Sequence, residues 1–282
     1  MSGPVLIEEP LQFGEGGRLL GILTLPSMRP SSAHKLPVFV FLSAGLLHRA
    51  GPHRLHVRLA RELAGRGFIS LRVDLAGRGD SLERIGLKNQ EAAAADYDEI
   101  VTVLDSRIGH HPFVLGGLCA GADNAIRLTL RDSRVIGMLL LDPVCGPDHG
   151  FAVRALANRY LMPARYVAWL KHRWKRLGKP KPAKTEGVDS LSLRDIPTPE
   201  QLRAAFESVR DRGGKVMCVF TQYALSYYNQ AGQLGQVLGL EGYSRFCTER
   251  FWLQAEHTFT LESQRSELIQ QVSEWAGGYT QP

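Results

Sequence analysis

The chain has 282 residues, of which 44% are hydrophobic and 22% are charged, so it can bury a sizeable core and is not a disordered protein. Its net charge of +6 is uneven, because residues 151–186 contain ten Lys/Arg and one Glu, which leaves the remainder at −3. A basic surface belonging to one segment argues against a nucleic-acid-binding domain, and no nucleic-acid partner is expected.

Apolar segments with strand and helix patterns alternate along the chain. After an antiparallel pair over residues 4–25, strands are predicted at residues 37–42, 68–73, 112–117, 135–141 and 215–221. Helices are predicted at residues 57–67, 91–108 and 120–131, and from about 263 to 275. Short, fully apolar strands that alternate with helices indicate an α/β fold with a mostly parallel sheet covered on both faces.

Residues 146–212 interrupt this alternation, and we interpret them as a helical cap inserted between two parts of the core, residues 1–145 and 213–282. Such an insertion would lie above the carboxyl ends of the strands, where open α/β sheets bind ligands. One helix of the cap is predicted to have an apolar stripe and a basic face. The stripe comprises Tyr166, Val167, Leu170 and Trp174, and the basic face comprises Arg165, Lys171, His172, Lys175 and Arg176. The basic face is a solvated surface, a dock for an acidic acyl carrier protein, or a contact with anionic lipid.

The segment Gly117-Leu-Cys-Ala-Gly121 joins a predicted strand to a predicted helix. A nucleophile on a sharp strand-to-helix turn needs small neighbours two residues away on either side, and this spacing supplies them. The N-terminus of the following helix favours a thiolate over a thiol. We therefore predict that Cys119 is a nucleophile.

The sequence Gly116-Gly-Leu-Cys-Ala-Gly-Ala-Asp-Asn124 resembles the nucleophile turn of bacterial cysteine α/β hydrolases, some of them related to exosortase-associated hydrolases. Residues 72–81, 227–230 and 256–260 resemble the same group. The resemblance covers about residues 4–141 and 214–275 and is weak across the cap. It implies the α/β-hydrolase fold and acyl chemistry, without indicating a substrate.

In the α/β-hydrolase fold the chain order of the catalytic residues is nucleophile, acid, histidine. His257 lies beyond the last predicted strand and is the predicted base. The usual acid position, residues 219–229, contains no carboxylate. Asp142 ends the preceding strand in a Leu-Asp-Pro segment similar to that of pancreatic-type lipases, so it is the predicted acid; the alternative role for this carboxylate is a cap on the turn before Pro143. Asn229 is the alternative, because an amide orients the histidine in papain-like enzymes.

The oxyanion hole is expected to combine two backbone N–H groups. One belongs to Ala120, directly after the nucleophile, and the other to Leu46, after the first core strand. Neither a cofactor nor a metal is expected.

Three functions fit these residues. The first is a hydrolase that cleaves an ester or thioester of a small molecule through an acyl-thioester on Cys119. The second is an acyltransferase or cyclase that passes the acyl group to an amine, alcohol or thiol, and the third is a non-catalytic binding protein. The sequence contains no apolar run long enough to span a membrane. Because its four cysteines form no CxxC pair, we expect a cytoplasmic, reducing location.

Overall fold

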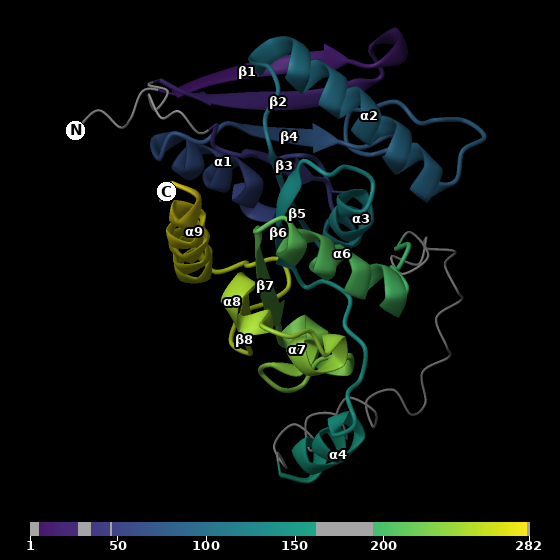
Figure 1. Cartoon of the computed structure of the whole chain (residues 1–282), viewed down its shortest axis with the longest axis vertical. Helices are drawn as coiled ribbons and strands as arrows, with labels where there is room; N and C mark the ends of the chain where they lie inside the picture. The colour runs from purple at the N-terminus through teal and green to yellow at the C-terminus, as the bar shows by residue number, and fades with distance from the viewer. Residues whose placement is uncertain (1–5, 28–34, 46, 162–193, 281–282) are drawn as a thin grey trace, which may run out of the picture.

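The computed structural model describes residues 6–27, 35–45, 47–161 and 194–280 (Figure 1). Its centre is an eight-stranded sheet with the order β1-β2-β4-β3-β5-β6-β7-β8. The strands are β1 (Leu6–Phe13), β2 (Leu19–Pro26), β3 (Val38–Leu42), β4 (Ser70–Asp74), β5 (Phe113–Leu118), β6 (Val135–Leu141), β7 (Lys215–Thr221) and β8 (Cys247–Trp252). β2 pairs antiparallel with β1 and with β4, and the other pairs are parallel. The expectation of a mostly parallel sheet is confirmed.

Helices cover both faces of this sheet. The described helices are α1 (Leu55–Gly65), α2 (Asn89–Ile108), α3 (Ala120–Thr129), α4 (Phe151–Leu161), α6 (Pro199–Asp211), α7 (Gln233–Leu238), α8 (Tyr243–Phe246) and α9 (Glu262–Ala276), of which α4 lies away from the sheet. The hydrophobic core has two parts, one on each face. α1 and α9 contribute to the part that contains Phe39, whereas α2, α3 and α6 contribute to the part that contains Leu115. Every residue of β3, β4 and β5 is buried, which agrees with the apolar sequences of β3 and β5, whereas β4 also buries Ser70, Arg72 and Asp74.

Strand β8 and the helices α6, α7 and α8 were not predicted from the sequence. β8 lies at the edge of the sheet and carries Thr248, Glu249 and Arg250, so it lacks the apolar signature of the inner strands. α6 lies within the segment interpreted as a cap, yet its side chains Leu202 and Phe206 are buried in the core. We therefore propose that the cap ends before Pro199.

Helix α4 begins the segment interpreted as the cap and lies at one end of the molecule, away from the sheet (Figure 1). Its apolar side chains Val153 and Leu156 are exposed. The predicted amphipathic helix over residues 165–176 lies outside the described residues. Within the described part of the chain, no helix has the length and apolar character needed to cross a membrane.

Candidate active site

Cys119 occupies a tight turn between β5 and α3. Its backbone has φ 55° and ψ −116°, a conformation that residues other than glycine rarely adopt. Glycine is required at the two neighbouring positions because a side chain would clash with the backbone there. A Cβ atom on Gly117 would lie 2.5 Å from the backbone carbon of Gly121, and one on Gly121 would lie 2.7 Å from the carbonyl oxygen of Leu42. The turn therefore holds the Cys119 side chain, which is half-buried, at the carboxyl end of a central strand.

The N-terminus of α3 begins directly after this cysteine. Ala120 is the first helical residue, so its N–H has no acceptor within the helix and is available to a ligand. The first turn is closed by a 3.0 Å hydrogen bond from the Asp123 N–H to the Cys119 carbonyl. Leu46, the other predicted oxyanion donor, lies outside the described residues.

Asp142 and His257 meet at the same edge of the sheet. His257 Nδ1 lies 2.7 Å from Asp142 Oδ2. The carboxylate is fully buried and also accepts two hydrogen bonds from Thr221 at the end of β7, one from the N–H and one from the hydroxyl, each 2.7 Å long. Thr221 lies where the catalytic acid usually occurs in this fold. Here it donates hydrogen bonds to Asp142, which follows the neighbouring strand β6.

The environment of His257 favours its protonated form. Burial by itself lowers the pKa of His257, but hydrogen bonds with Asp142 and Cys119, together with the negative charges of both groups, outweigh burial and raise that pKa to about 9. The Tyr223 ring stacks on the imidazole, with the two ring centroids 3.9 Å apart. Cys119, His257 and Asp142 thus form one connected group, assembled from three separate loops.

Asn229, the alternative partner for the histidine, is engaged elsewhere. Its Nδ2 donates to the Phe151 carbonyl at 3.0 Å, and its Oδ1 accepts from Arg154 Nε at 2.8 Å. These contacts tie Asn229 to α4. His257 contacts Asp142 and not Asn229, so we propose Asp142 as the residue that orients it.

Arg194 and Asp123 were missed by the sequence analysis. Arg194 Nη2 donates to Asp123 Oδ1 at 3.1 Å and to the Asp142 carbonyl at 3.3 Å, and its Nε donates to Asp123 Oδ2. Burial opposes the charge of Arg194, but the hydrogen bonds and charge of Asp123 outweigh it and raise the pKa of the guanidinium. Arg194 could not be identified from the sequence because both of its partners lie far along the chain.

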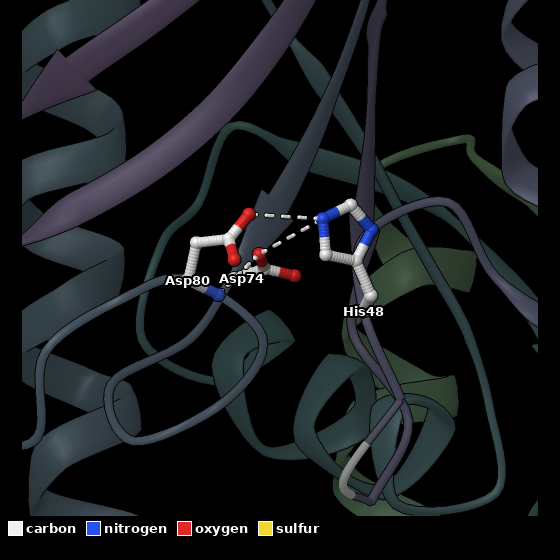
Figure 2. Close-up of side chains that lie close together, drawn as sticks. All are labelled: His48, Asp74 and Asp80. Atoms are coloured by element: carbon white, nitrogen blue, oxygen red, sulfur yellow. Dashed lines mark hydrogen bonds and ion pairs between the residues drawn. The ribbon is translucent and has the colours of Figure 1, made fainter.

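A second cluster of histidine and carboxylates lies at the end of β4 (Figure 2). His48 Nε2 is 3.1 Å from Asp80 Oδ2 and 3.9 Å from Asp74 Oδ2, a grouping that a metal ion could use. However, Arg49 Nη1 donates to Asp74 and also to Asp80, the latter at 2.8 Å. Hydrogen bonds from Arg49 and His48 lower the pKa of Asp80. The guanidinium already supplies the positive charge that a cation would bring, so these residues do not fit a metal site.

Solved structures similar to this chain include an esterase and a dienelactone hydrolase. The Pyrococcus furiosus esterase shares 13% identity and a TM-score of 0.60, with 98% of this chain and 92% of that chain covered. Est1E from Butyrivibrio proteoclasticus shares 11% identity and a TM-score of 0.57, with 96% and 98% covered. A dienelactone hydrolase from Anabaena variabilis shares 14% identity and a TM-score of 0.54, with 99% of each chain covered. These likenesses confirm the α/β-hydrolase fold.

A search of curated protein sequences found no significant match. Residues 43–193 match the protein family described as serine aminopeptidase, S33. The matched segment includes the tight turn, where residues 113–125 contain Cys119 and no serine. Because the match spans more than half of the chain and the fold agrees, the protein belongs to the serine aminopeptidase S33 family of α/β hydrolases.

Proposed function

We propose that the protein hydrolyses an ester or thioester through a covalent acyl-thioester on Cys119. The sulfur attacks the carbonyl carbon, and the resulting oxyanion receives a hydrogen bond from the Ala120 N–H. Collapse of the tetrahedral intermediate breaks the bond to the leaving alcohol or thiol, which takes a proton from His257. Water then attacks the thioester while His257 removes its proton, and the acid product leaves with the cysteine restored.

One observation carries this proposal: the 2.7 Å contact between His257 and the buried Asp142, beside a cysteine on a strained turn. A nucleophile, a base and a group that orients the base are the minimum for this chemistry. The non-catalytic alternative rested on the missing carboxylate after the penultimate strand. Asp142 supplies a carboxylate from another strand, so that argument for a binding protein no longer holds.

The names of the similar proteins support an ester as the substrate. Two of the similar structures are named as an esterase and a dienelactone hydrolase, and Est1E has been seen with bound ferulic acid. Each of these names describes a protein that acts on, or binds, a carboxylic acid or its ester. We take a small-molecule acyl compound as the substrate class.

Acyl transfer is the second candidate, and the sulfur nucleophile favours it. A thioester reacts readily with amines and thiols, so an acceptor bound near Cys119 would compete with water for the acyl group. Docking of an acyl carrier protein on the basic helix stays a prediction, because that helix lies outside the described residues.

The test is steady-state turnover of p-nitrophenyl acetate, with and without an added amine acceptor. We expect Cys119→Ala to lower turnover by at least roughly 10³-fold. Cys145→Ala is the matched control, because Cys145 is a buried thiol outside the site and should retain most activity. Both reactions release p-nitrophenol, so acetate as the sole acetyl-containing product identifies a hydrolase and an acetylated acceptor identifies a transferase. Normal turnover by Cys119→Ala would contradict the covalent mechanism.

A further inference from the structure

Arg194 links the two parts of the candidate site that lie on different strands. It is the first described residue after the segment 162–193, and its side chain is only 5% exposed. On one side it forms a two-pronged ion pair with the fully buried Asp123 of α3. On the other side it donates a 3.3 Å hydrogen bond to the carbonyl of Asp142.

Both contacts reach the reacting groups through the backbone. Asp123 is bonded to the nucleophile turn through its N–H, 3.0 Å from the Cys119 carbonyl. Asp142 has φ 46°, a left-handed conformation that is strained for a residue other than glycine. Its carbonyl is held by Arg194 and, at 3.5 Å, by the Tyr227 hydroxyl. A strained peptide persists only where its surroundings fix it.

We propose that Arg194 is a positioning residue that fixes the Asp142 backbone relative to the Cys119 helix, so that the Asp142 carboxylate points at His257. This inference rests on the proposed function for its effect on turnover. Its effect on the histidine does not depend on any substrate. Arg194 donates its hydrogen bonds to Asp123 and to the Asp142 backbone, so it acts on His257 through Asp142.

The choice of variant follows from the buried ion pair. Removing the charge at residue 194 would leave Asp123 buried without its partner and would risk unfolding the protein. Arg194→Lys keeps the charge, but an ammonium group lacks the planar fork that reaches Asp123 and Asp142 together. Arg127→Lys is the matched control. Arg127 is a half-buried arginine of α3 that donates to Asn124 at 2.7 Å and to the Asp195 carbonyl, beside Arg194, without contacting Asp142.

Two measurements test the proposal in the folded protein: titration of the His257 imidazole by NMR, and kcat and KM for p-nitrophenyl acetate. For Arg194→Lys we expect the pKa of His257 to fall from about 9 toward 6.5. We also expect kcat to fall roughly 10- to 100-fold with little change in KM. For Arg127→Lys we expect no shift in the pKa of His257 and a change in kcat of no more than about twofold.

An unchanged His257 titration in Arg194→Lys would overturn the proposal. An equal shift in both variants would also overturn it, because the effect would then come from anchoring residues 194–195 and not from the Asp142 backbone. Turnover that survives in Cys119→Ala would refute the proposed function alone, since the titration still reports the link from Arg194 through Asp142 to His257.

Discussion

Two clusters at the carboxyl edge of the sheet each combine a histidine with a fully buried aspartate at a strand end. Asp142 follows β6 and contacts His257, whereas Asp74 ends β4 and lies near His48. The two clusters differ in the groups that donate hydrogen bonds to the buried carboxylate. Neutral donors of Thr221 bind Asp142, while the guanidinium of Arg49 binds Asp74.

We propose that this difference separates a catalytic arrangement from a structural one. Among the described residues, no lysine or arginine side chain pairs with the Asp142 carboxylate, so its negative charge acts on His257 and helps to raise the pKa of that histidine. In the other cluster Arg49 neutralises Asp74 and also binds the exposed Asp80. A buried carboxylate beside a histidine is therefore a candidate for catalysis when no arginine or lysine neutralises it, so that its negative charge acts on the histidine.

The largest expected effect is on turnover. Asp142→Asn should lower kcat/KM for p-nitrophenyl acetate by about 10²–10⁴-fold, because an amide cannot stabilise the imidazolium that forms during the reaction. Asp74→Asn is the control at the corresponding position of the other cluster, and it should stay within a few-fold of the unchanged protein. Equal losses in the two variants, measured on folded protein, would remove the distinction between the clusters.

The second effect is on the pKa of His257, measured by NMR. Asp142→Asn should lower this pKa from about 9 toward 6.5, since the carboxylate is one of the groups that raise it. A raised pKa stabilises the folded state fully below pH 6.5, and that stabilisation is lost as the pH rises through about 9. The variant should therefore show less loss of unfolding free energy between these pH values. A titration near 9 in the variant would mean that Asp142 does not control His257.

The third effect is on stability. Arg49→Met leaves Asp74 buried without its ion pair, so we expect the free energy of unfolding to fall by about 2 kcal/mol. Urea denaturation followed by circular dichroism measures this change. Turnover per folded molecule should be nearly unchanged, because Arg49 contacts neither Cys119 nor His257 through any hydrogen bond. A variant that folds normally but has lost its activity would place the Arg49 cluster in the catalytic machinery.

The smallest effect expected is that of divalent cations. Because Arg49 already supplies the positive charge between Asp74 and Asp80, a chelator should not change turnover. Zn²⁺ should not raise the thermal unfolding midpoint of Cys119→Ala, a background that removes the thiolate as a Zn²⁺ ligand. In Cys119→Ala/Arg49→Met, by contrast, Zn²⁺ should raise that midpoint, since two carboxylates and His48 are then free to bind it. Equal stabilisation of both variants by Zn²⁺ would contradict the role given to Arg49.

The core of the fold was predictable because its strands and helices have strong periodic patterns. β3 and β5 are buried on both faces and are apolar throughout. β8 was not predicted, because its charged residues do not form an apolar pattern. Its partly buried Glu249 accepts hydrogen bonds from Tyr228 and Tyr243, contacts that the sequence of β8 does not reveal. The local pattern of apolar residues identifies strands and helices that bury an apolar face. It does not identify those that depend on polar partners far along the chain.

The candidate site follows the same rule. The glycines around Cys119 mark the turn in the sequence itself, so that residue was predicted from local evidence. The choice between Asp142 and Asn229 was open because it depends on Thr221, which lies 79 residues from Asp142 in the sequence. Arg194 had no local signal at all, since its partners are 71 and 52 residues away.

The most direct test of the central claim is mass spectrometry of the protein after brief incubation with p-nitrophenyl acetate. The account predicts one acetyl group on the peptide that contains Cys119, removable by hydroxylamine and absent from Cys119→Ala, with Cys145, Cys218 and Cys247 unmodified. Continued release of p-nitrophenol by Cys119→Ala, with no acetyl group on the Cys119 peptide of the unchanged protein, would contradict it.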